Sequence, residues 1–131
     1  MSDPVFVFGS NLAGRHGKGA ALWAREHRGA IYGQGVGYQG NSYAIPTKGV
    51  SPNPRAPMPI LPLYEIDWHV HRFLEFARAH PELTFQLTPI GCGYAGYSPA
   101  DIAPMFAGAP PNVTMPPEFI SVLCAAGRED T

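Results

Sequence analysis

Two glycine clusters, each placed where a strand is expected to end, constrain this chain more than any other feature of its sequence. Residues 9–21 read GSNLAGRHGKGAA, and residues 89–97 read PIGCGYAGY. An apolar run precedes each cluster, at 5–8 and at 85–87, and a helical pattern follows each one. Glycines let backbone N–H groups approach an anion closely, and the N-terminus of the next helix adds its positive dipole end. Two such loops in one small domain predict a site that holds a diphosphate.

The size and charge of the chain narrow the class of protein. With 131 residues, it is long enough for one domain with a single core, which we place at about 5–115, with a C-terminal tail at 116–131. Nine Lys and Arg residues are scattered among ten Asp and Glu residues, so there is no basic stripe for a nucleic-acid backbone. No apolar stretch approaches the length of a membrane span or a signal segment, so we expect a soluble, cytoplasmic protein without a membrane partner.

Strands and helices are expected to alternate along the chain. Apolar runs predict strands at 5–8, 42–46, 84–87 and 113–115, the first of them buried on both faces. Helical spacing predicts helices from about 19 to 28 and from 66 to 77, and Ser98-Pro99 is a typical start of a third, short helix. Residues 33–41 and 48–62 read as turn-rich and proline-rich loops, and the structure of the apolar run at 119–126 stays open. The pattern predicts an α/β fold with three layers (α/β/α) and a mainly parallel or mixed central sheet.

The glycine spacing argues against two common nucleotide folds. Gly14, Gly17 and Gly19 are spaced more widely than the G-x-G-x-x-G of dinucleotide-binding domains, and the expected downstream acid is missing. A P-loop needs a hydroxyl residue directly after its lysine, whereas Gly19 follows Lys18.

The cysteines and histidines do not form a metal-binding pattern. Cys92 and Cys124 are expected to be free thiols, and a packing role for Cys92 is favoured over a reactive one. His69 and His71 point in different directions on a helix, so they do not form a ligand pair for one ion. We therefore expect neither a metal nor a cofactor.

Both glycine clusters resemble those of the macrodomain family, whose members are three-layer α/β modules that bind ADP-ribose between two loops. In the first, Asn11 stands before the glycine-rich segment 14–19 and the small residues Ala20 and Ala21. In the second, Ile90-Gly91-Cys92-Gly93 is similar to the Ile-Gly-Cys-Gly turn of the terminal ADP-ribose glycohydrolase branch. The resemblance covers about residues 5–115, and its specific motifs lie at the two loops.

The resemblance implies a set of ligand-binding residues. Asn11 would offer its amide to a ribose hydroxyl, or would instead close a turn of its own loop. His16 and Lys18 would be phosphate or acid–base partners, or else solvated loop residues, and Tyr94 or Tyr97 would stack near a ribose or base. The implied ligand-binding set is Asn11, Gly17, Lys18, Gly19, Ala20, Ala21, Gly91, Cys92, Gly93, Tyr94, Ala95, Gly96 and Tyr97.

The sequence departs from the hydrolytic branches of the family at their acidic positions. Those positions fall on Ala21 and Ala95, and alanine supplies no carboxylate. The leading hypothesis is therefore a module that binds ADP-ribose or a related nucleotide, free or attached to a protein or nucleic acid. The first alternative is an ADP-ribosyl hydrolase that uses Asn11 or His16. The second is a protein-interaction module that uses the proline-rich loop and Trp68 and binds no nucleotide.

Overall fold

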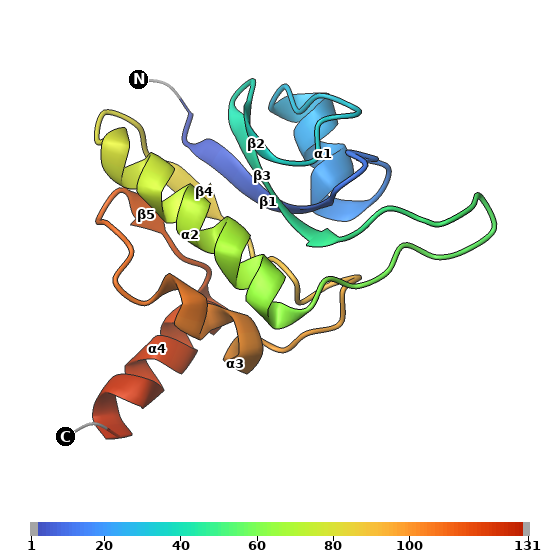
Figure 1. Cartoon of the computed structure of the whole chain (residues 1–131). Helices are drawn as coiled ribbons and strands as arrows, with labels where there is room; N and C mark the ends of the chain where they lie inside the picture. Colours follow the sequence, from blue (N-terminus) through green and yellow to red (C-terminus); the bar gives the residue numbers. More distant parts are fainter. Residues whose placement is uncertain (1–2, 130–131) are drawn as a thin grey trace.

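A computed structural model describes residues 3–129 and shows an α/β fold built on a five-stranded mixed sheet (Figure 1). The strand order is β2-β3-β1-β4-β5, with β2 antiparallel to β3 and all other neighbours parallel. The strands are β1 (Val5–Asn11), β2 (Gly37–Gln39), β3 (Ser42–Lys48), β4 (Phe85–Leu87) and β5 (Val113–Thr114). The helices are α1 (Gly19–His27), α2 (Leu63–Ala79), α3 (Pro99–Ile102), which continues as a 3-10 helix (Ala103–Phe106), and α4 (Pro117–Glu129). The predicted α/β class and mainly parallel sheet are confirmed.

Strand β1 lies at the centre of the sheet and is buried on both faces. It pairs with β3 on one side and with β4 on the other. Side chains alternate along a strand, so Val5 and Val7 join the core under α2, whereas Phe6 and Phe8 join the core beside α1. The continuous apolar run at 5–8 therefore reflects a strand that is covered on both sides, as its sequence predicts.

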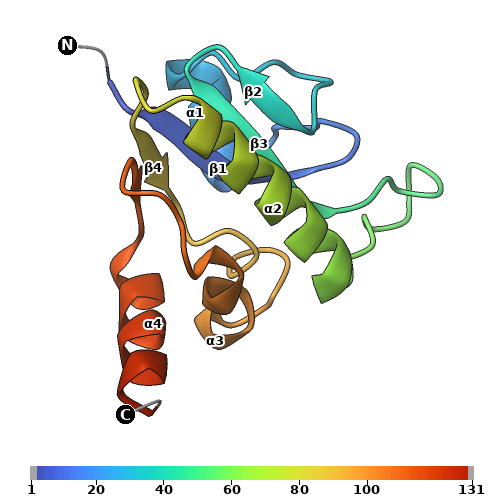
Figure 2. The ribbon, with the colours of Figure 1, turned by 60° about the vertical axis from the view of Figure 1, so that its left-hand side comes forward.

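The two faces of the sheet carry layers of unequal size. The α2 face holds the larger core, where Phe73 of α2 packs edge-to-face against Phe85 with ring centroids 5.4 Å apart. The α1 face is thin, because the buried residues of α1 are the small Ala21 and Ala24. Trp23 of α1 also packs against Phe6, with ring centroids 4.7 Å apart, but it is partly exposed. Figures 1 and 2 show α1 and α2 on opposite sides of the sheet.

The first turn of the C-terminal helix packs onto the core. The segment whose structure the sequence leaves open forms α4, and Phe119 in its first turn is fully buried against Phe106, with ring centroids 5.8 Å apart. The turn-rich segment 33–41 contains β2, which the sequence analysis does not predict. The predicted start of α3 is confirmed, since Ser98 and Asp101 form a reciprocal capping box. Among the residues described, none of the helices is both long and apolar enough to cross a bilayer.

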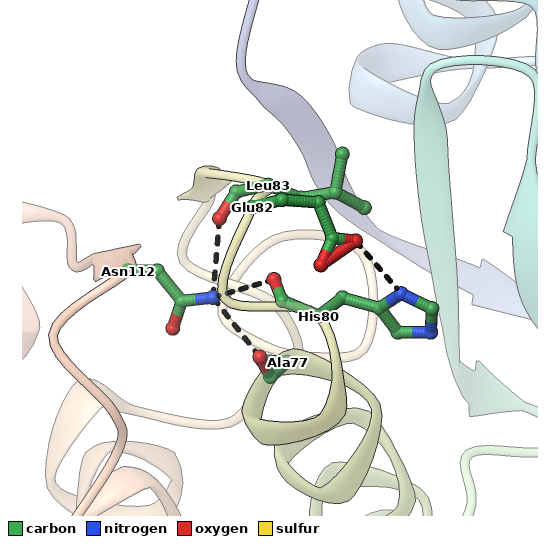
Figure 3. Close-up of polar contacts among 5 residues, drawn as sticks. All are labelled: Ala77, His80, Glu82, Leu83 and Asn112. Carbon is green, nitrogen blue, oxygen red and sulfur yellow. Dashed lines mark hydrogen bonds and ion pairs between the residues drawn. The ribbon is translucent and has the colours of Figure 1, made fainter.

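Asn112, just before β5, ties the end of α2 to the turn that leads into β4 (Figure 3). Its amide Nδ2 lies 2.9 Å from the carbonyl oxygen of Ala77 and 3.1 Å from those of His80 and Leu83. Helix C-termini leave carbonyl groups without intrahelical partners, so a side-chain donor at this place stabilises the helix end. The same residue connects two segments that are distant in sequence, residues 77–83 and the start of β5.

We expect Asn112→Asp to destabilise the fold by about 2–3 kcal/mol, because a carboxylate only accepts hydrogen bonds and would face three carbonyl oxygens. Urea unfolding would measure the loss. Asn53→Asp is the matched control, since Asn53 is exposed and accepts a hydrogen bond from the Arg55 N–H through Oδ1, which aspartate retains. Equal stability of the two variants would contradict the role of Asn112.

Candidate functional site

The two glycine clusters meet at one cleft of about 680 Å³ at the carboxyl ends of β1 and β3. Ligands of open α/β sheets bind at this edge of the strands. The walls come from the loop after β1, the first turn of α1, the loop after β4, and the first turns of α3 and α4. The lining residues are Gly9, Ser10, Asn11, Arg15, Gly17, Lys18, Ala20, Ala21, Thr47, Lys48, Met58, Thr88, Pro89, Ile90, Gly91, Cys92, Gly93, Tyr94, Ala95, Pro99 and Glu118.

Asn11 closes the first loop and also lines the cleft. Its Nδ2 donates to the carbonyl oxygen of Arg15 at 3.0 Å, and its Oδ1 accepts from the Arg15 N–H at 2.9 Å. This is the turn-closing role that the sequence leaves as the alternative to ligand contact. A primary amide has two N–H donors, so one remains for a ligand.

The glycines of the first cluster serve two different purposes. Gly14 has a φ of +72°, and a Cβ there would overlap the backbone of Gly33 and Gln34. A Cβ on Gly35 would likewise overlap the carbonyl oxygen of Asn11, so these glycines let two loops pack backbone to backbone. Gly17 is different, because a Cβ at this position would meet no atom within 4 Å. Gly17 therefore leaves space that belongs to the cleft.

The second cluster forms a tight turn whose centre is open. The Tyr97 N–H donates to Gly91 at 2.8 Å, and the Gly96 N–H donates to Gly93 at 3.0 Å. A Cβ on Gly93 would meet no atom within 4 Å. Tyr97 is directed elsewhere, since its hydroxyl donates to the carbonyl oxygen of Leu61 at 2.7 Å, and neither it nor Gly96 lines the cleft.

Both loops offer backbone N–H groups without protein acceptors. Lys18 is the N-cap of α1, and no side chain caps this end of the helix. The first hydrogen bond of the helix runs from the Leu22 N–H to the carbonyl oxygen of Lys18. Within residues 3–129, no acceptor is found for the N–H groups of residues 17–21 or of residues 93–95. These are the groups that bind phosphate in glycine-rich loops and at helix N-termini. The cleft is thus bordered by two sets of free donors.

Three cationic side chains line the cleft, and they come from two parts of the chain. Arg15 and Lys18 belong to the first loop, and Lys48 ends β3. The exposed ring of Tyr94 lies between the two lysines, with Lys18 Nζ 6.0 Å and Lys48 Nζ 5.5 Å from its centroid. In the described part of the chain, none of the three cations forms a salt bridge. They are therefore available to an anion.

Tyr94 also joins the two loops across the cleft. A Cβ added to Gly19 would lie 3.0 Å from Cε2 of Tyr94, so the ring rests close to the backbone at the start of α1. Gly19 itself does not line the cleft. Its role is to let the ring approach.

His16 lies outside the cleft. It is fully buried, with its ring edge-to-face against Phe8 and its Nε2 2.9 Å from the carbonyl oxygen of Gln34 and 3.2 Å from Oε1 of Gln39. Both neighbours are acceptors, so Nε2 carries the proton. The structure thus places this predicted phosphate or acid–base residue in the core, where it holds the first loop to β2.

Cys92 lines the cleft as a half-buried thiol. Burial raises its pKa above the ordinary thiol value, and the negative charges of Glu118 and Asp101 raise the pKa further. A raised pKa lowers the fraction of thiolate at neutral pH. These surroundings agree with the packing role.

The remaining motif residues lie on α2, away from the cleft. His71 contacts Asp67, with its Nδ1 3.3 Å from Oδ1, and burial lowers the pKa of His69. Trp68 is exposed, with the Arg72 guanidinium over its ring at 5.1 Å. Among the side chains that the structure describes, no three His, Cys, Asp or Glu residues are grouped to hold a metal ion.

Several residues of the cleft are not predicted from the sequence. Ten of the thirteen residues in the implied ligand-binding set line it, and Gly19, Gly96 and Tyr97 do not. Arg15, Thr47, Lys48, Met58 and Glu118 line it without having been predicted. The only sequence signal for Lys48 is its place at the end of an expected strand, beside the edge where the glycine loops lie.

Comparisons with known proteins identify no relative. No family model matches the chain, and neither the curated proteins nor the solved structures contain a significant match.

Because the pKa of Cys92 is raised, we expect iodoacetamide at about pH 8 to modify Cys124 before Cys92. Cys124 is exposed on α4 and serves as the internal comparison. Peptide mapping by mass spectrometry over time would give both rates. If Cys92 were modified faster than Cys124, some group would have to lower the pKa of the Cys92 thiol, and this would contradict the effect of burial, Glu118 and Asp101.

Proposed function

We propose that this protein binds ADP-ribose or a related ADP-ribosyl group, with the diphosphate held between the two glycine loops as in a macrodomain-like module. The observation that carries the proposal is the pair of loops with free N–H donors that border one cleft. A single loop would suit one phosphate. Two loops at a shared cleft suit two linked phosphates.

The charge of the cleft supports an anionic ligand. The whole chain has a net charge of −1, yet three of its nine Lys and Arg residues line this one cleft, including both lysines of the sequence. Like charges gathered without partners in a protein repel one another, so such a cluster is typical of an anion-binding site.

The size and lining of the cleft support a ligand larger than a phosphate ion. A volume of about 680 Å³ lies within the usual range for small-molecule sites. Met58, Pro89, Ile90 and Pro99 supply apolar surface, and Tyr94 offers an exposed ring to a ribose or base. Apolar walls with a few polar groups are typical of nucleotide sites.

Binding is proposed in preference to hydrolysis. Ala95 occupies the position where the resemblance places a catalytic acid, and it lines the cleft as a buried alanine. His16 is held in the core, so it does not serve as the acid–base group of the alternative hypothesis.

Isothermal titration with ADP-ribose, AMP and NAD under identical buffer and salt conditions tests the proposal. We expect saturable binding with the highest affinity for ADP-ribose. Absence of heat with all three ligands would overturn the proposal.

Substitution of Gly93 is expected to block the cleft without harming the fold. Gly93 has no strained φ, and nothing lies within 4 Å of an added Cβ, so a larger side chain enters the open space. We expect Gly93→Ala to weaken ADP-ribose binding modestly and Gly93→Leu to weaken it about a hundredfold, which corresponds to about 2.7 kcal/mol. Titration calorimetry would measure both.

Ala79→Leu is the control for the Gly93 series, because it adds the same side chain at an exposed position at the end of α2. Its affinity is expected to equal that of the unmodified protein, and thermal unfolding would show that all three variants remain folded. If Gly93→Leu bound ADP-ribose with unchanged affinity, the ligand would have to lie elsewhere.

The two lysines are expected to contribute through their charge. Lys18→Met and Lys48→Met keep much of the apolar stem and should each weaken ADP-ribose binding about fivefold to tenfold, because a charge-assisted hydrogen bond is lost. Arg55→Met, on the exposed proline-rich loop, removes one positive charge outside the cleft and should have no comparable effect. A loss in Arg55→Met equal to that in the lysine variants would indicate a general effect of net charge.

A further inference from the structure

Helix α4 brings a carboxylate into a cleft that is otherwise cationic. Glu118 is the one acidic residue among the described residues of the lining, and it comes from the C-terminal segment, outside the part of the chain that resembles a known family. Figures 1 and 2 show α4 and α1 at opposite ends of the molecule, and both helices contribute residues to the lining of the cleft.

The backbone of Glu118 is fixed by its neighbours. Pro116 is buried, and its carbonyl oxygen accepts hydrogen bonds from the N–H groups of Phe119 at 3.0 Å and Ile120 at 3.1 Å. Phe119 is fully buried against Phe106. Glu118 directly precedes the buried Phe119 in the first turn of α4, so the packing of α4 fixes the position of its backbone at the cleft, while its own side chain is exposed.

The carboxylate of Glu118 has no partner in the part of the chain that the structure describes. It makes no hydrogen bond to another side chain or to the backbone, and no salt bridge to Arg15, Lys18 or Lys48. Its negative charge still reaches the cleft wall, because it contributes to the raised pKa of Cys92. The cleft therefore presents unpaired charges of both signs.

A carboxylate repels phosphate, so beside a diphosphate site it is suited to contact a different group of the ligand. Ribose hydroxyls and the exocyclic amino group of adenine are donors, and a carboxylate accepts from both. From this arrangement, and resting on the proposed function, we infer that Glu118 is a specificity-determining residue that accepts a hydrogen bond from an O–H or N–H group of the nucleotide outside its diphosphate.

Glu118→Ala and Glu118→Gln test this inference with three ligands. They are ADP-ribose, ADP, which lacks the terminal ribose, and inosine diphosphate ribose, in which a carbonyl oxygen replaces the adenine amino group. We expect Glu118→Ala to weaken ADP-ribose binding at least about tenfold, and Glu118→Gln to give a smaller loss because its amide oxygen still accepts.

The pattern of losses identifies the donor. Weakening with ADP-ribose but not with ADP would assign the hydroxyls of the terminal ribose. Weakening with ADP-ribose and ADP but not with the inosine compound would assign the adenine amino group. Weakening with all three would assign the hydroxyls of the adenosine ribose, which all of them share.

Glu75→Ala is the matched control, since Glu75 is an exposed glutamate on α2 outside the cleft and its loss changes the net charge equally. An acidic residue in the first turn of a helix also stabilises the helix through its dipole. If Glu118 had only this structural role, its substitution would lower the unfolding midpoint but would leave the ratios of the affinities for the three ligands unchanged. Thermal unfolding of each variant separates the two roles.

Two results would overturn the inference, and they are distinguishable. Unchanged or tighter binding of all three ligands by both Glu118 variants would overturn it while leaving the proposed function intact. Failure of the unmodified protein to bind any of the three would overturn the proposed function together with it.

Discussion

The burial of β1 on both faces is the constraint on which the rest of the structure depends. Val5 and Val7 anchor the layer under α2, and Phe6 and Phe8 anchor the layer beside α1, so both layers are built on one strand. Its two neighbours run parallel to it, and the three strands therefore end at the same edge of the sheet. The loops after β1 and β4 become neighbours for this reason, although they are far apart in the sequence, and the cleft forms where they meet.

The glycines show how one residue type serves packing and site formation in the same loop. Gly14 and Gly35 permit backbone contact between residues 11–15 and 33–35, and a side chain at either position would push these segments apart. Gly17 and Gly93 face open space, and the absence of a side chain at these positions leaves room for a ligand. The two kinds of glycine are indistinguishable in the sequence, because the difference depends on whether a distant segment passes close by.

The elements that the sequence predicts well are those that local patterns determine. The apolar run of β1, the helical spacing of α2 and the Ser98 cap of α3 depend on neighbouring residues and are confirmed. The place of His16 in a glycine loop indicates a site residue, but the structure buries it against Gln39 of β2, a strand in a segment whose sequence indicates turns. Lys48 and Glu118 reach the cleft through strand pairing and through the burial of Phe119, and neither contact has a local signature.

The distribution of charge in the cleft bears on how a ligand would be oriented. An exposed ion pair contributes little, but unpaired charges around a concave site act together on a ligand that excludes water. The first loop supplies two cations, β3 supplies the third, and α4 supplies one carboxylate, and these groups do not neutralise one another in salt bridges among the described side chains. Under the proposed function, a simple anion gains only from the cationic groups. A nucleotide whose diphosphate is followed by hydroxyl or amino donors gains from both kinds of charge, and it does so in one orientation only. The cleft would therefore select ligands by the order of their chemical groups as well as by their net charge.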